Sequence, residues 1–156
     1  MKTKLLSLLS VLSLLPALGQ SRTDSIEFRG QYIKYDVSLF LDHVLITDYS
    51  DSITTCPGIM KQYILNKKGK GKYAASFVTY MGKPMTPHDE KAGEVLLSKE
   101  EKAHRTVFRY RSSDNEYYSR EDYLDGGKVF LMYQHVREED LQQFDTLLDS
   151  IKIMSQ

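Results

Sequence analysis

Apolar and polar residues alternate through much of the chain, and this alternation predicts a sheet. From Tyr32 to Leu41 every second residue is apolar, the period of two that a half-buried strand shows. Residues 44–46 continue that strand or pair with it. Runs rich in β-branched and aromatic residues predict further strands at 59–65, 73–81, 105–111 and 117–124. The polar or glycine-bearing segments between them, at 48–55, 66–72 and 112–116, predict loops.

A hairpin is predicted where Asp125-Gly126-Gly127 separates two β-rich runs, because these residues tolerate the positive φ angles of a tight turn. In the register that this turn favours, Leu124 pairs with Val129 and Arg120 pairs with Tyr133. The run 128–136 is apolar at almost every position, which is typical of a strand that is central in its sheet or buried on both faces.

The hairpin register also assigns residues to the two faces of the sheet. One face receives Tyr118, Leu124, Val129, Leu131 and Tyr133. The other receives Tyr117, Tyr123, Phe130 and Met132, with Arg105, Arg109 and Arg111 on the neighbouring strand. Both faces are partly apolar, so the pattern does not choose which one a helix covers, and a slip of one residue would exchange them.

Helical spacing of apolar residues at the end of the chain predicts a closing helix. Its buried side consists of Leu141, Phe144, Leu147, Leu148 and Ile151. Gln142, Asp145 and Asp149 are expected to face away from the sheet. A second, shorter helix is predicted within 87–103, since Thr86 and Pro87 form a helix start and Ser98 with Glu101 forms a capping box. The alternative is a short strand at 94–97, because Gly93 weakens a helix.

These elements predict the α+β class, a central antiparallel sheet of roughly five to seven strands covered by a C-terminal helix and a shorter helix. Residues 1–19 are typical of a signal peptide, with a lysine-bearing start, an apolar run too short to span a membrane, and small residues before Gln20. Residues 20–156 are then a single exported domain, periplasmic or secreted, without a transmembrane segment after cleavage.

Charge and cysteine content narrow the function classes. Removal of Lys2 and Lys4 leaves 19 basic against 21 acidic residues, a balance that does not attract nucleic acid. Cys56 is the single cysteine, so no intramolecular disulfide forms; it is either a small buried residue or a reactive thiol. The four histidines, at 43, 88, 104 and 135, lack metal-ligand spacing, and no catalytic or cofactor motif is present. We therefore expect neither a metal nor a cofactor.

Arginines and tyrosines on two neighbouring strands are the candidate binding residues. They are Arg105, Arg109, Arg111, Tyr117, Tyr118 and Tyr123. Arginine and tyrosine dominate recognition surfaces, because they offer a large contact area at a low entropic cost. The alternative is a cross-strand salt ladder in which Glu121 lies between the arginines.

The C-terminal segment resembles the PsbP-like families. The resemblance is carried by the Asp125-Gly126-Gly127 turn, the apolar strand, an acidic step and the ending Leu-x-x-Phe-x-x-Leu-Leu-x-Ser-Ile-Lys-Ile, and the early run Gly30-Gln-Tyr-Ile-Lys-Tyr-Asp-Val is compatible with it. It implies a sandwich in which a final strand and helix cover an antiparallel sheet, with an accessory or binding role. It supplies no catalytic residues.

Three functions are compatible with these observations. The first is a small exported non-enzymatic protein that binds another protein. The second is a small-ligand binder or small enzyme with a cavity between sheet and helix, holding His135, Tyr133 or Arg109. The third is association with the cell envelope through the basic loop 67–72.

Overall fold

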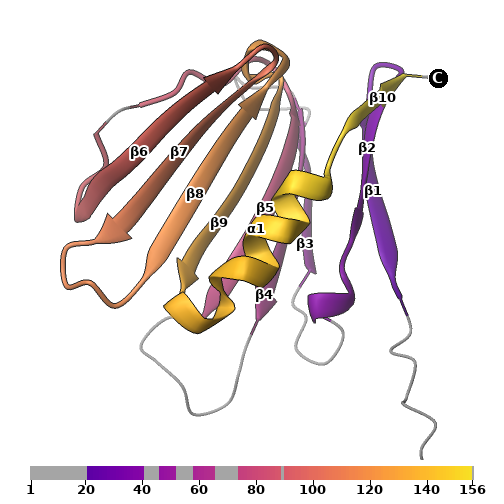
Figure 1. Ribbon diagram of the computed structural model, residues 1–156. Helices are drawn as coiled ribbons and strands as arrows, with labels where there is room; N and C mark the ends of the chain where they lie inside the picture. The colour runs from indigo at the N-terminus through magenta and orange to yellow at the C-terminus, as the bar shows by residue number, and fades with distance from the viewer. Residues whose placement is uncertain (1–20, 41–45, 52–57, 66–73, 89, 156) are drawn as a thin grey trace, which may run out of the picture.

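The computed structural model describes residues 21–40, 46–51, 58–88 without 66–73, and 90–155, with only the backbone for 46–51. Within these residues the chain forms two antiparallel sheets and one α-helix (Figure 1), which confirms the α+β class. The predicted signal peptide, Cys56 and the basic loop 67–72 lie outside the described residues. No helix in the described part of the chain is long and apolar enough to cross a membrane.

The larger sheet has seven strands in the order β3-β4-β5-β9-β8-β7-β6. Their bounds are β3 Ile46–Asp51, β4 Gly58–Leu65, β5 Ala75–Gly82, β6 Glu94–Lys102, β7 Arg105–Ser112, β8 Tyr118–Leu124 and β9 Val129–Val136. The almost wholly apolar run therefore lies in the middle of the sheet, as predicted. Strand β3 extends to Asp51, so the predicted loop 48–55 was wrong in its first half.

The β8–β9 hairpin has the predicted register, with Leu124 opposite Val129 and Arg120 opposite Tyr133. Asp125, Gly126 and Gly127 all have positive φ angles, of 47°, 64° and 85°. Gly127 also lies so close to residue 85 that a Cβ atom there would be 2.2 Å from the Met85 carbonyl oxygen. Glycine is therefore required at this position by space as well as by φ.

The smaller sheet has the order β1-β2-β10 and combines both ends of the described chain. It consists of β1 Thr23–Phe28, β2 Gln31–Asp36 and β10 Ile153–Ser155. The strand predicted to reach Leu41 ends at Asp36, whose carboxylate accepts a 2.7 Å hydrogen bond from the Ser38 amide. This bond begins the short 3-10 helix Ser38–Phe40. Strand β10 has no signal in the local pattern.

The helix α1, Leu141–Ser150, and the small sheet cover the same face of the large sheet (Figure 1). The main core lies between them. Phe144 and Leu148 from the helix meet the β9 residues of this face, and Tyr35 from β2 packs edge-on against the Phe77 ring. The helix thus covers the face that carries Leu124 and Tyr133, which settles the question that the sequence pattern left open.

The opposite face of the large sheet carries a second aromatic cluster. Its members are Tyr80, Phe108, Tyr110, Tyr123 and Phe130. Residues 83–88, which follow β5, contact this face. The Tyr80 hydroxyl donates to the Lys83 carbonyl at 3.0 Å, and the Tyr110 hydroxyl donates to the His88 carbonyl at 2.9 Å. Both faces of the sheet are thereby covered near its centre.

The shorter helix predicted within 87–103 is wrong. Residues 94–102 form β6 and pair with β7, with a bulge between Leu96 and Ser98. The capping pattern of Ser98 and Glu101 favours a helix only through local interactions. The backbone of β7 offers a continuous row of hydrogen-bond partners, which the local sequence does not reveal. The weaker alternative, a short strand at 94–97, pointed to the right structure.

We predict that Leu148→Ala lowers the free energy of unfolding by about 2 to 5 kcal/mol, because the side chain is fully buried against the sheet. Urea unfolding followed by circular dichroism measures this change. Gln143→Ala, on the exposed side of the same helix, is the matched control and should change stability by less than about 0.5 kcal/mol. Equal effects of the two changes would contradict the position of the helix.

Candidate functional site

Two rows of residues run across β6, β7 and β8 on the face that α1 covers. In the first, Val95 lies opposite Arg111, which lies opposite Tyr118. In the second, Ser98 lies opposite Arg109, and Arg109 lies opposite Arg120. Directly opposed residues project from the same face. The prediction that the arginines share a face with Tyr123 was therefore wrong, because the β7–β8 register was not defined by any local turn signal.

The Arg120 side chain is the centre of an ionic cluster between the sheet and the helix. It is only 2% exposed. Its Nε donates to Asp122 at 2.8 Å and its Nη2 to the same carboxylate at 3.0 Å, while Nη1 donates to Asp145 at 2.8 Å and Nη2 to Asp149 at 2.6 Å. Each nitrogen of this buried guanidinium has a carboxylate partner, as a buried charge requires.

Arg105 extends the cluster to the end of the helix. Its Nε donates to Asp122 at 2.8 Å and its Nη2 donates to the Leu148 carbonyl at 2.8 Å. That carbonyl belongs to the last turn of α1, where a cation favours the negative end of the helix dipole. Asp122, fully buried, is therefore shared by two arginines from neighbouring strands.

Asp145 and Asp149 do not face away from the sheet as predicted. Asp145 also accepts a 3.1 Å hydrogen bond from the Tyr133 hydroxyl and lies 3.6 Å from the Arg109 guanidinium. The apolar stripe of α1 packs on β9, so the flank of the helix beside the stripe meets the arginines of β7 and β8. Helical periodicity identifies the stripe, but it does not identify what lies beside it.

Burial and hydrogen bonding act in opposite directions on these groups. Burial disfavours the charge of Arg120, but hydrogen bonds to Asp122, Asp149 and Asp145 outweigh burial and raise its pKa. Burial would raise the pKa of Asp149, but the hydrogen bond from Arg120 and the nearby arginine charges hold it below the usual range. The contacts between Arg120 and Asp149 thus favour the charged form of both side chains.

Two arginine nitrogens in this region keep unused hydrogen-bonding capacity. Arg109 Nη1 and Arg111 Nε are buried and have no hydrogen-bond partner in the part of the chain that the structure describes. Arg111 also lacks a carboxylate within ion-pair distance among those residues. The predicted salt ladder through Glu121 does not form with the arginines, since Glu121 pairs with Lys91 at 2.8 Å on the opposite face.

Of the three predicted tyrosines, the structure brings only Tyr118 to the arginines. Tyr118 is half-buried beside Arg111. Tyr117 is buried against the ring of His135, and Tyr123 lies in the aromatic cluster of the other face, donating to Glu121 at 2.8 Å. The structure thus assembles Arg105, Arg109, Arg111 and Tyr118 on one face, without Tyr117 and Tyr123.

Of the three alternative residues proposed for a ligand cavity, the structure brings two together and places the third elsewhere. Tyr133 and Arg109 both approach Asp145, whereas His135 contacts Tyr117 and has a positive φ of 58°. Burial lowers the pKa of His135. The charge of Glu94 acts against this shift, whereas the charge of Lys91 adds to it. The space between α1 and the sheet is filled by buried Phe144, Leu148 and Arg120.

Sequence reasoning missed Arg120 and Asp122. Their signal is the presence of two opposite charges, two residues apart, in the strand that the hairpin pairs with the almost wholly apolar run 128–136. Residues i and i+2 of a strand share a face, so such a pair in a central strand indicates a buried ion pair.

Comparisons with known proteins supply no family and no function for this site. No protein-family model, no curated protein and no solved structure matches the chain. Among the described residues, no group of three His, Cys, Asp or Glu side chains is arranged to hold a metal ion.

We predict that Arg120→Met lowers the free energy of unfolding by about 3 to 5 kcal/mol, because it removes one of the two arginines that pair with buried Asp122 and breaks the ion pairs to Asp145 and Asp149. Chemical denaturation measures this loss. Arg111→Met is the matched control, since it removes the same charge and shape from the neighbouring strand without breaking an ion pair, and it should stay within about 0.5 kcal/mol of the parent. A small loss for Arg120→Met would show that the cluster does not hold the helix.

Acid should weaken the attachment of α1. The folded-state pKa of Asp149 is depressed, so its contribution to stability is complete above its unfolded pKa and is lost as the pH falls through its folded pKa. We predict that stability declines in urea titrations from about pH 5 to about pH 2, and that Asp149→Asn makes the decline shallower. An unchanged pH dependence in this variant would contradict the contribution of Asp149.

Proposed function

We propose that this chain is an exported binding protein that acts by engaging another protein rather than by catalysis. The observation that carries the proposal is the Arg–Tyr surface, which we define as Val95, Arg109, Arg111 and Tyr118. Here Arg111 has no ionic partner among the described residues, and its Nε is buried without an acceptor. An arginine with unused donors beside a half-buried tyrosine is a frequent arrangement in protein interfaces.

The chemistry of the Arg–Tyr surface favours an acidic partner. Unsatisfied buried donors are costly, so an incoming carboxylate that accepts from Arg109 or Arg111 removes that cost and adds a charge-assisted hydrogen bond. In the neighbouring ionic cluster, Asp122 is engaged by Arg105 and Arg120, whereas Asp145 also pairs with Arg109 at 3.6 Å. Arg111 is therefore the main candidate to receive the carboxylate of a partner.

The edge of the sheet next to these residues suits an extended segment. Strand β6 is the last strand in the sheet order, and its first half exposes Val95, Leu96 and Leu97 by 48%, 38% and 48%. A partner strand can add to such an edge through backbone hydrogen bonds. The charged half of β6, 99–102, limits the addition to the apolar half. We infer an extended partner segment that carries an acidic residue among apolar ones.

This role agrees with the accessory function that the PsbP-like resemblance implies, and the relationship itself remains a proposal. The observations support surface binding better than a ligand between sheet and helix, because large buried side chains fill that space. Export rests on the signal peptide predicted from the sequence, and envelope binding through the loop 67–72 stays a prediction.

We predict that the protein from Gln20 onward retains a specific partner when used as bait in envelope and culture fractions, with mass spectrometry of the retained proteins. Arg111→Ala and Tyr118→Ala should each reduce retention of that partner at least roughly tenfold, the scale of an interface hot spot. Lys34→Ala, on the exposed side of β2, is the control and should retain it fully. Full retention by Arg111→Ala, with an unchanged melting temperature, would contradict the proposal.

A further inference from the structure

A cavity of about 410 Å³ lies where three chain segments meet at one end of the large sheet. The segments are the β1–β2 turn, the end of β5 and the β8–β9 turn. The lining residues are Phe28, Arg29, Gln31, Met81, Gly82, Lys83, Pro84 and Lys128. This volume is in the range of pockets that hold small organic ligands.

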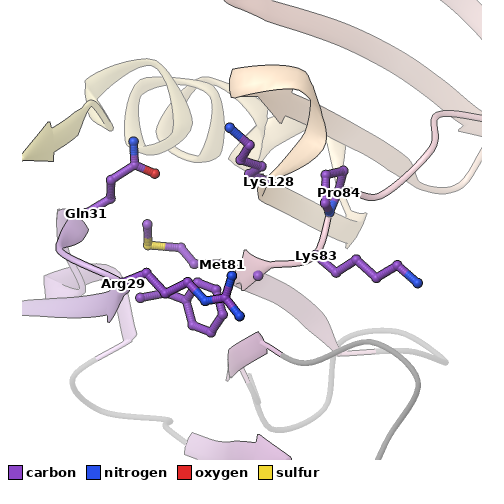
Figure 2. A pocket seen from close by; sticks show the side chains of 8 residues that line it. Arg29, Gln31, Met81, Lys83, Pro84 and Lys128 are labelled. Atoms are coloured by element: carbon purple, nitrogen blue, oxygen red, sulfur yellow. The ribbon is translucent and has the colours of Figure 1, made fainter.

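The cavity combines an apolar floor with a cationic rim. Met81, Phe28 and Pro84 supply apolar surface, while Arg29, Lys83 and Lys128 are basic and no lining residue is acidic. Figure 2 shows Arg29 and Lys128 on opposite sides of Met81, whereas the Lys83 side chain extends away. Arg29 and Lys128 therefore border the apolar floor directly.

The walls of the cavity are fixed by backbone contacts. The Gly82 amide donates to the Lys128 carbonyl and the Met85 amide donates to the Gly127 carbonyl, each at 2.9 Å. These bonds hold the end of β5 against the β8–β9 turn. Two of the three walls are therefore fixed to each other, and the third is the β1–β2 turn, which is closed by the pairing of Phe28 with Gln31.

Arg29 occupies a position where an arginine is costly. Phe28 pairs with Gln31, so Arg29 and Gly30 form a two-residue turn, with positive φ angles of 52° and 79°. Such turns favour Asn, Asp or Gly at the first position, because a larger side chain is strained there. The Arg29 guanidinium lies 5.1 Å from the centre of the Phe28 ring, which keeps it over the cavity wall. A strained residue at a cavity rim suggests a binding role.

Lys128 remains available to a ligand. Its Nζ lies 3.2 Å from Asp125, but both side chains are substantially exposed, so this pair is weak and exchanges readily. An anion in the cavity therefore gains two charge-assisted contacts at little cost in broken interactions.

We propose that this cavity binds a small organic anion, with a carboxylate or phosphate head between Arg29 and Lys128 and a short apolar body against Met81 and Phe28. The site is separate from the Arg–Tyr surface: Lys128 precedes the first residue of β9, whereas Tyr118 lies opposite Val136 at the other end of that strand. Failure of one proposal therefore leaves the other standing.

The test is calorimetric titration of the protein from Gln20 onward, which contains every described residue, with four probes: octanoate, octyl phosphate, octanol and inorganic phosphate. We expect saturable binding of octanoate, octyl phosphate or both, and much weaker binding of octanol and inorganic phosphate. The preference between the two amphiphiles identifies the head group. Absence of saturable binding by both, equal binding of octanol, or equal binding of inorganic phosphate would overturn the proposal.

Variants test the assigned residues. Arg29→Gln and Lys128→Gln should each weaken binding roughly tenfold, and Lys34→Gln, which removes one charge from the same hairpin, should leave it unchanged. Arg29→Gly separates binding from folding: it should weaken binding equally while it keeps or raises the melting temperature, because glycine relieves the positive φ. An equal loss in Lys34→Gln, or full binding by Arg29→Gly, would overturn the assignment.

Discussion

The buried guanidinium of Arg120 is the interaction on which much of the architecture depends. A charge that is 2% exposed is stable only when its donors are satisfied, and here two of the three partner carboxylates come from α1. The helix is therefore fixed beside β8. Strand β10 begins three residues after α1 ends and pairs with β2, so the position of the helix also determines where the small sheet is anchored.

The small sheet has its own polar attachment on the other side. Asp24 of β1 accepts hydrogen bonds from the Tyr63 hydroxyl at 2.6 Å and from Lys61 at 3.0 Å, both on β4. Burial would raise the pKa of Asp24, but these bonds outweigh it and lower that pKa. Helix and small sheet thus cover the central strands and the β4 side, while among the described residues no helix or sheet lies over β6 on the same face (Figure 1). This incomplete cover leaves Arg111 and the apolar half of β6 accessible.

The two proposed sites follow from these geometric constraints. The Arg–Tyr surface lies beside the region where the cover of the sheet ends. The cavity lies where the β1–β2 turn of the small sheet approaches the end of β5, so it exists because the small sheet is held on this face. Both sites are locally basic although the chain has equal numbers of basic and acidic residues, since many of the acidic side chains are engaged in ion pairs elsewhere.

Local sequence determined the features that local physics controls. The positive φ angles tolerated by Asp125-Gly126-Gly127 set the register of the central hairpin, and the spacing of Leu141, Phe144 and Leu148 set the helix. Tertiary structure alone decided the rest. Residues 94–102 form a strand because they hydrogen-bond to β7. Strand β10 forms because the helix places it beside β2. Asp145 and Asp149 contact the sheet because Arg120 is buried there. These outcomes depend on contacts between segments that are far apart in the chain. Packing and the pairing of buried charges decide those contacts, and the periodicity of a single segment does not encode them.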